Sequence, residues 1–446
     1  MMISARSRQL FGAVVVSLVH FLAGSSVTLS SIIIPSLQMS TEEISWFASI
    51  LFLGVLIGSV SGCLYCDLIG WRSSLILDSL GFSIGFLLIG FGEQSIYFLC
   101  LGRFLNGFFI GTTKCSMMVY ICEFSQPNLR GLLGAVNLMI FMIGFSFPFF
   151  MSLFLHWSLV TLSVCFPAFI SIIGLFMMKE SPVWLLRKKG EEKARESLEF
   201  FRGRDSDIKA QLQDLKESIR NVDESFGSRL KDVKKKAFYK PFFYLCFILI
   251  ALEWSSFPVL GSYMINIFQQ TGSTLDPVWS SLMICVIRIL FAALALSLLS
   301  KLPRRLVYLA STAVTGLALA LLGLFCWLSS SMNLPNSVQI LPLVFMALIY
   351  IGYSLGYGNI AFILQGELFP PHLRSFGCGT LLCAEMISAF AAIKSSGFLI
   401  AKVGLHSLFW IYSVVVFAAF FFAFFLMPET KDKTMTQIQR EFLGKV

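Results

Sequence analysis

Charged side chains are scarce in this sequence. Asp, Glu, Lys and Arg make up 13% of its 446 residues, whereas a soluble domain carries about 25%. This deficit excludes an exterior that is solvated on all sides. Hydrophobic residues reach 57%, and many form unbroken runs of roughly 20 residues, long enough to cross a bilayer as a helix. The sequence therefore predicts an all-α membrane protein with many spans.

Signals for catalysis are missing as well. No nucleophile motif, metal-ligand spacing or phosphate-binding loop is present, so we expect neither an enzyme nor a cofactor or bound metal. Cys63 and Cys66 form a C-x-x-C without a second pair, and we interpret the cysteines as small buried side chains. The net charge of +9 lies in particular loops, as membrane topology would place it, so we expect no nucleic-acid partner.

Hydropathy predicts twelve spans. Their expected ranges are 8–31, 44–64, 72–92, 97–121, 131–154, 158–178, 241–267, 278–300, 304–330, 340–364, 376–400 and 405–427. Basic residues fall mainly in the loops on one side, which places both termini in the cytoplasm. The first apolar run is too long for a cleavable signal peptide, so we expect it to be retained as a helix.

Half of all Lys and Arg residues lie between Lys179 and Lys240, which we interpret as a cytoplasmic linker. The expected domains are an N-terminal six-helix bundle (1–178), this linker (179–240), a C-terminal six-helix bundle (241–427) and a cytoplasmic tail (428–446). Helical periodicity over Gly190–Ser218 predicts short amphipathic helices. The Lys231–Lys236 cluster is interpreted as an anchor against anionic lipid, with a specific lipid site as the alternative.

The two halves repeat each other at the cytoplasmic ends of their spans. Glu123 and Arg130 lie seven residues apart, as do Glu367 and Arg374. Two parallel repeats are typical of transporters, and we expect these charges to gate them by ion pairs that lock the inner helix ends. The candidate gate residues are Asp67, Arg72, Glu123, Arg130, Glu180, Arg304, Arg305, Glu367, Arg374 and Glu429.

Several motifs resemble the sugar porter family of the major facilitator superfamily, and within it the arthropod branch similar to facilitated trehalose transporters. The motifs are Gly62–Arg72 (G-x-x-x-x-D-x-x-G-x-R), Gly102-Arg103, Val119–Glu123, Leu129-Arg130-Gly131, Glu180–Leu185, Gly366–Pro370, Pro428–Thr434 and, for the arthropod branch, Gly272–Asp276. The resemblance covers essentially the whole chain. It implies a major facilitator fold of two six-helix repeats and a sugar substrate.

The sugar site that this resemblance implies has changed. Family members hold hexose through a Gln in the fifth span, Gln-Gln-x-Ser-Gly-x-Asn in the seventh, Gly-Pro-x-Pro-Trp in the tenth and an Asn in the eleventh. The corresponding positions here are Leu138, Leu252–Pro258, Gly358–Phe362 and Glu385. Amides and hydroxyl-bonding groups are thus largely replaced.

Several of the predicted spans contain charged residues. Glu253 and Glu385 lie near mid-span, as do Lys114, Arg288 and Lys394. Ionisable residues at that depth are costly and indicate a functional site or an ion pair. The candidate substrate-binding residues are Asn137, Glu253, Trp254, Tyr263, Asn359, Phe362 and Glu385.

Three functions remain open at this point. The first is facilitated alternating-access transport of a sugar, trehalose or hexose, across the plasma membrane, because the first span lacks the Asp of the proton-coupled symporters. The second is a facilitative or proton-linked carrier of an organic cation or other small solute through Glu253 and Glu385. The third is a non-transporting receptor or sensor on the same fold.

Overall fold

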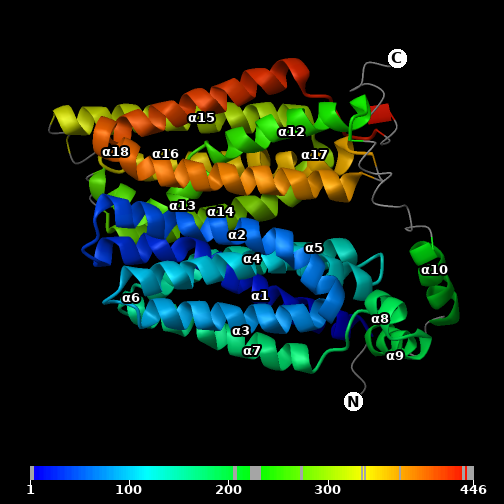
Figure 1. The fold of residues 1–446 in the computed structure, drawn as a ribbon. Coiled ribbons are helices and arrows are strands. Elements are labelled where there is room, and N and C mark those ends of the chain that lie inside the picture. Colours follow the sequence, from blue (N-terminus) through cyan, green and yellow to red (C-terminus); the bar gives the residue numbers. More distant parts are fainter. Residues whose placement is uncertain are drawn as a thin grey trace. The chain divides into compact units, whose positions relative to one another are not determined.

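The computed structural model describes residues 5–203, 208–220, 233–271, 275–332, 335, 338–370, 373–433 and 437–438. Gly272–Thr274 of the arthropod motif, Lys231 of the basic cluster and much of the tail lie outside these residues. Where the structure is described, it is built from helices (Figure 1). The chain divides into two units: Met1–Val27, Ile50–Pro148 and Leu155–Ser225 form unit 1, and Thr28–Ser49, Phe149–Phe154 and Phe226–Val446 form unit 2.

Eleven helical segments of the described chain are long and apolar enough to cross a membrane. The last, Phe376–Leu426, belongs to α18 (Arg374–Leu426), which is interrupted at Gly404 with φ 82° and ψ 162°. It therefore supplies two crossings, and the prediction of twelve spans is confirmed. The uninterrupted helices are α1 (Ala5–Ile33), α2 (Thr41–Ile69), α3 (Trp71–Gly90), α4 (Ile96–Phe124), α5 (Arg130–Met151), α14 (Pro277–Lys301) and α15 (Arg304–Ser331); a short 3-10 turn, η1 (Ile34–Ser36), follows α1.

Three further spans are assembled from shorter pieces. The sixth comprises α6 (Trp157–Ser163) and α7 (Cys165–Phe176), and the seventh comprises α12 (Lys236–Glu253) and α13 (Phe257–Gln270). The tenth comprises α16 (Leu341–Gly352), a π-helical turn η3 (Tyr353–Tyr357) and α17 (Gly358–Leu368). Hydropathy reports apolar length and does not detect where backbone hydrogen bonding changes.

In unit 1, α2 and α4 approach each other through glycines. A Cβ placed on Gly58 would lie 1.9 Å from the Phe108 carbonyl oxygen, and one on Gly107 would lie 2.0 Å from that of Leu51. Glycines allow this contact because they have no side chain between the two backbones. Within lipid the hydrophobic effect does not drive helices together, so close packing of this kind supplies much of the attraction. The α3 helix packs against α4, α6 and α7 in the same unit.

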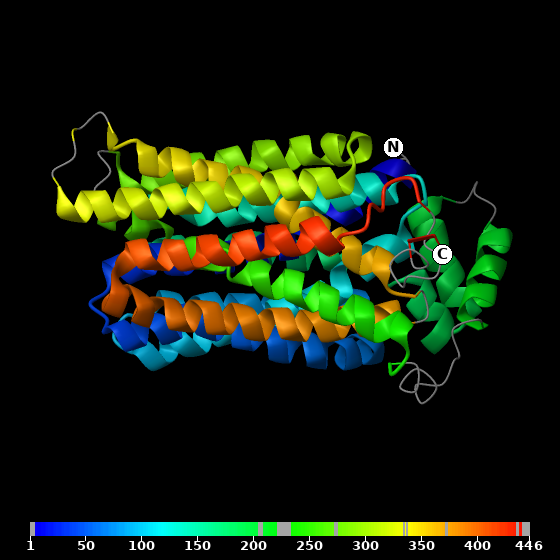
Figure 2. The same ribbon diagram turned by 90° about the horizontal axis from the view of Figure 1, so that it is seen from above.

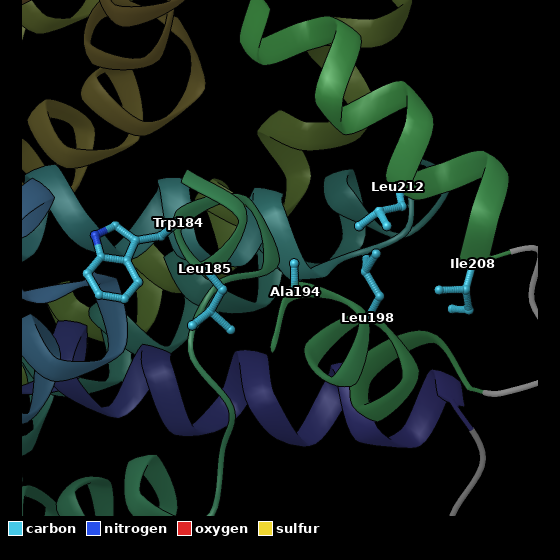
Figure 3. Close-up of a cluster of buried hydrophobic side chains, with 6 residues drawn as sticks. All are labelled: Trp184, Leu185, Ala194, Leu198, Ile208 and Leu212. Atoms are coloured by element: carbon cyan, nitrogen blue, oxygen red, sulfur yellow. The ribbon is translucent and has the colours of Figure 1, made fainter. Parts of the chain in front are cut away.

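The linker contains two helices in the range where periodicity predicts them, α9 (Glu191–Arg202) and α10 (Ile208–Arg220), and a third before that range, α8 (Pro182–Lys188). All three lie at one end of the unit 1 helices (Figures 1 and 2). Each helix contributes two side chains to a shared apolar cluster (Figure 3): Trp184, Leu185, Ala194, Leu198, Ile208 and Leu212. The apolar faces of the three helices thus cover one another, and the linker has a small hydrophobic core of its own.

In unit 2, α15 packs along α18 and α16, and α12 packs along α18 and α17. Figure 1 shows these helices running side by side. The discontinuous spans, α12–α13 and α16–η3–α17, therefore lie among continuous helices. These two interruptions carry most of the candidate site.

Candidate functional site

The seventh span breaks immediately after Glu253. Ser256 has a φ of 75°, in the left-handed region, and Pro258 lies in the first turn of α13. The N–H of Ser255 donates to the Leu252 carbonyl at 3.1 Å, one residue away from its α-helical partner Ala251. Left-handed backbone is costly for a residue other than glycine and is often found at functional sites.

The tenth span is joined to this break by a hydrogen bond. The hydroxyl of Tyr357, at the end of η3, donates to the carbonyl of Ala251 at 3.0 Å. In a continuous α-helix the Ala251 carbonyl would accept the N–H of Ser255. Here it accepts the Tyr357 hydroxyl instead. Asn359, a candidate substrate residue, donates its side-chain N–H to the Ser354 carbonyl at 2.5 Å, so part of its hydrogen-bonding capacity serves the π-helical turn.

Three charged side chains gather around this turn. Tyr353 lies within electrostatic range of Arg288, Glu253 and Glu385, which are 4%, 9% and 4% exposed. They come from three different spans, on α14, α12 and α18. Two carboxylates therefore accompany one guanidinium in a buried setting. The sequence separations between these three residues, from 35 to 132 residues, show that only the fold brings them together.

An aromatic platform supports the guanidinium. The rings of Phe257 and Tyr353 are stacked, with centroids 3.6 Å apart and an interplanar angle of 2°. The guanidinium carbon of Arg288 lies 4.8 Å from the Phe257 centroid and 5.9 Å from that of Tyr350. Such cation–π contacts strengthen when they are desolvated. Neither Phe257 nor Tyr353 was among the predicted site residues.

The remaining candidates are spread more widely. Tyr263 is 5% exposed and lies where α13 is kinked, with φ −126° and ψ 17°. Trp254 is half-buried in the break, and Phe362 on α17 is 45% exposed. Asn137 belongs to unit 1, where its amide donates to the sulfur of Met118 at 3.7 Å.

Sequence reasoning missed a buried carboxylate in unit 1. Asp78 on α3 is fully buried and accepts hydrogen bonds from Tyr65 (2.9 Å), Thr112 (2.6 Å) and Thr113 (3.0 Å). Its three donors come from α2 and α4, so the carboxylate ties three helices together. Because Asp78 falls inside a predicted span, the criterion that selected Glu253 could have found it.

His20 on α1 was also missed. It lies beside Asn137 and within electrostatic range of Lys114, and its ring centroid is 4.5 Å from that of Phe141. These residues all belong to unit 1. The histidine thus accompanies Asn137, a residue that we had selected for its amide.

The N-terminal gate residues form a carboxylate cradle. Glu180 follows the sixth span and accepts the backbone N–H groups of Arg72 (2.9 Å), Ser73 (3.3 Å) and Ser181 (2.9 Å). The first two begin α3, where unsatisfied N–H groups and the helix dipole favour an anion. The Arg72 guanidinium donates to the Met178 carbonyl at 2.6 Å. The end of the sixth span is thereby fastened to the start of the third.

Two more of these carboxylates bind the linker side of unit 1. Asp67 pairs with Arg187 at 3.3 Å and Lys188 at 3.1 Å, both on α8. Glu123 at the end of α4 accepts the hydroxyl of Ser181, the residue that caps α8. The carboxylates at the ends of α2 and α4 thus hold α8 in place.

Unit 2 repeats the cradle. Glu429 follows the twelfth span and accepts the N–H groups of Arg304 (3.1 Å), Arg305 (3.1 Å), Thr430 (2.9 Å) and Lys431 (2.9 Å). The first two begin α15, the ninth span, as Arg72 and Ser73 begin the third. The predicted equivalence of the two halves therefore extends to the same hydrogen bonds.

The side chains around the second cradle add an ion pair. Arg304 donates to the carboxylate of Glu367 at the end of α17, and to the Thr430 hydroxyl at 3.2 Å. Burial tends to raise the pKa of Glu429, but the four N–H donors outweigh it and hold the pKa below the usual range of a glutamate. Each of these contacts joins elements of the same unit.

The comparisons with known proteins agree with this architecture. The family model described as "Sugar (and other) transporter" matches residues 11–442. The chain is 28% identical over 422 residues to the facilitated trehalose transporter Tret1 of Drosophila virilis, covering 94% of this chain and 46% of that protein. It is 26% identical over 448 residues to Tret1 of Polypedilum vanderplanki, covering 98% and 88% respectively. The chain thus spans about half the length of the first relative.

Solved structures show the same fold. The inward open conformation of the xylose transporter XylE from E. coli superposes with a TM-score of 0.82 at 18% identity, covering 97% of this chain and 99% of that one. Its partially occluded inward open conformation gives a TM-score of 0.80 at 19% identity, covering 96% and 100%. With the family match over residues 11–442, this chain, a multi-pass membrane protein, belongs to the sugar transporter family.

Proposed function

We propose that this protein carries a sugar across the membrane by alternating access, as a facilitated carrier without a coupled ion. The observation that carries the proposal is the family match over residues 11–442. The similarity to proteins named as facilitated trehalose transporters supports trehalose as the first substrate to test. The absence of Asp or Glu from the first span supports facilitated diffusion.

The C-terminal contribution to the substrate site is centred on η3 and the break after Glu253. A sugar needs several hydrogen-bonding partners and an apolar surface for its ring. Carboxylates accept hydroxyl protons, a guanidinium donates to hydroxyl oxygens, and the Phe257–Tyr353 stack offers a flat face. Glu253, Glu385 and Arg288 would thus replace amides in this role. The other predicted residues of unit 2, Trp254, Tyr263, Asn359 and Phe362, belong to this proposed contribution, and Asn137 is the proposed substrate contact in unit 1.

The domain organisation follows from the repeat. Residues 1–178 and 241–427 act as the two rocking bundles, and 179–240 is the cytoplasmic linker between them. The Lys and Arg residues concentrated in that linker support a cytoplasmic position for it and for both termini. The plasma membrane is the proposed location.

The two cradles are the proposed fixed parts of the cytoplasmic gate. Glu180 and Glu429 each clamp the end of one span to the start of another within their own unit. Bundles fastened in this way move as rigid bodies, which alternating access requires. Arg130 and Arg374, at the start of the fifth and eleventh spans, are proposed to take part in ion pairs that separate as the bundles rock.

Uptake of radiolabelled trehalose and glucose by oocytes expressing the chain tests this function. The expected result is saturable trehalose uptake of similar rate at acidic and neutral pH, with surface expression verified by biotinylation. Water-injected oocytes set the background. Uptake that requires acidic pH would contradict uncoupled transport. Uptake of an organic amine, without sugar uptake from the same oocytes, would contradict the sugar substrate.

A further inference from the structure

A groove lies in unit 2, between the first half of α12 and the last turns of α18. Its volume is about 680 Å³. Most of the side chains that line it are apolar: Lys240, Phe243, Tyr244, Phe247, Phe422, Phe425, Leu426, Met427 and Pro428. The groove is thus a mostly apolar depression with a lysine among its lining residues.

Aromatic rings make up much of the lining of this groove. The ring centroid of Phe422 lies 5.2 Å from that of Tyr244 and 4.2 Å from that of Phe247. Phe243 and Phe425 are 68% and 75% exposed. These residues lie in segments long and apolar enough to span a membrane. Exposed rings there meet hydrocarbon, so acyl chains fit the groove better than water does.

Positive charge collects at one end of the groove. Lys240 lines it, and the exposed residues Lys234, Lys235 and Lys236 lie one to two turns earlier in the chain. From α15, the Arg305 guanidinium donates to the Phe424 carbonyl, next to the lining residue Phe425. The apolar lining suits the acyl chains of a phospholipid, and the ammonium and guanidinium groups at one end suit an anionic headgroup.

Two carboxylates follow α18 in the sequence. Glu429 is engaged by four backbone N–H groups, so its carboxylate is already compensated at the cradle. Asp432 has a side chain that is 86% exposed to solvent and lies 3.9 Å from Lys431.

We propose that this groove binds an anionic glycerophospholipid, with its phosphate at Lys240 and an acyl chain along Phe243, Phe247 and Phe425. The site differs from the Lys231–Lys236 cluster, of which the structure describes Lys234, Lys235 and Lys236 as exposed, because it pairs one lysine with a shaped apolar surface. It does not depend on which solute the protein carries. A lipid held there bridges α12 and α18 and stabilises their packing at that end of unit 2.

Native mass spectrometry of the delipidated full chain tests the proposal. Phosphatidylglycerol and phosphatidylcholine with identical acyl chains are the probes. We expect tighter retention of phosphatidylglycerol, and Lys240→Gln should weaken that retention about fivefold, the contribution of one lysine near a charged headgroup. Phe425→Ala, at an exposed ring, should weaken the retention of both lipids.

Lys402→Gln is the matched control. Lys402 also lies against a phenylalanine on α18, with its Nζ 4.4 Å from the Phe398 ring centroid, but it does not line the groove. Its replacement should leave lipid retention unchanged. Equal retention of the two lipids by the parent protein, or equal losses in Lys240→Gln and Lys402→Gln, would overturn the proposal.

A second measurement avoids dependence on a lysine variant that fails to fold. Phe247→Trp places a reporter in the lining of the groove, and brominated acyl chains quench a tryptophan that they touch. Quenching beyond that of the parent protein should be stronger with brominated phosphatidylglycerol than with brominated phosphatidylcholine. Equal quenching by the two lipids would show that the groove holds acyl chains without selecting the headgroup, and would also overturn the proposal.

Discussion

The hydroxyl of Tyr357 donates a hydrogen bond to the carbonyl of Ala251 at 3.0 Å. These residues lie 106 positions apart, one in the π-helical turn of the tenth span and the other just before the break in the seventh. The Ala251 carbonyl, which lacks its α-helical donor because of the break, thus accepts a hydrogen bond from a side chain of the other span. The two irregularities support each other, and the charged groups of the candidate site lie around them.

Tyr357→Phe should destabilise the protein by about 1–3 kcal/mol, because it leaves the buried Ala251 carbonyl without this donor. Thermal unfolding in detergent measures the effect. Tyr412→Phe is the control, since the buried Tyr412 hydroxyl makes no hydrogen bond within the described part of the chain. If both variants unfold at the same temperature, the bond does not stabilise the break.

Glu429→Gln should lower stability at neutral pH by roughly 1 kcal/mol, a value reduced for the screening of a partly exposed group. The pKa of Glu429 is lowered in the folded protein, despite burial, by four N–H donors. Its ionised form therefore stabilises the fold above the unfolded-state pKa, and this contribution is lost as the pH falls through the folded-state pKa. The difference in stability between the parent protein and Glu429→Gln should therefore become smaller at acidic pH.

Unfolding temperatures of both proteins across a pH series provide this test. Asp432→Asn serves as the control, because its exposed side chain lies 3.9 Å from Lys431 and accepts none of the cradle hydrogen bonds. A gap that stays constant from neutral to acidic pH would mean that the cradle does not depend on the charge of Glu429.

Gly70→Ala should disrupt the N-terminal cradle. Gly70 has a φ of 99°, and an added Cβ would lie 2.4 Å from Oε2 of Glu180. Gly190→Ala is a close match, because Gly190 has a φ of 95° with nothing within 4 Å of its Cβ position. Backbone strain of about 1–3 kcal/mol is common to both variants. The loss of stability should therefore be larger in Gly70→Ala, and equal losses would argue that the Glu180 contact adds nothing.

Glu385→Asn should increase sugar uptake relative to the parent protein. The variant restores an amide where the family resemblance implies one, and it leaves Arg288 facing a single carboxylate. Glu217→Gln on α10, an exposed position, is the control and should leave uptake unchanged. A folded Glu385→Asn protein with unaltered uptake would remove Glu385 from the substrate site.

The fold could be predicted from the sequence to a large extent. The lengths of the apolar runs predicted all twelve spans, including two separate spans within α18. The structure divides α18 at Gly404, where a φ of 82° allows the chain to turn between the two runs. The repeated motifs gave the correspondence between the halves. Both signals are local, so they can be read without knowing which helices meet.

The candidate site was less predictable because it depends on contacts between distant residues. Nothing local indicates that Glu429 receives the N–H groups of Arg304 and Arg305, more than 120 residues earlier. The Tyr357 hydroxyl donates to the carbonyl of Ala251 just before the break after Glu253, and Asp78 accepts hydroxyls from two other helices. The charged residues could be selected one by one, but their partners come from the packing of the bundle.

Counterflow in proteoliposomes tests the central claim most directly. Purified protein is reconstituted, the vesicles are loaded with unlabelled trehalose, and entry of labelled trehalose is followed. The account predicts a transient accumulation of label above its external concentration, because an alternating-access carrier exchanges sugar across the membrane. Entry that only approaches the external concentration, or no entry by protein shown to be folded and inserted, would contradict it.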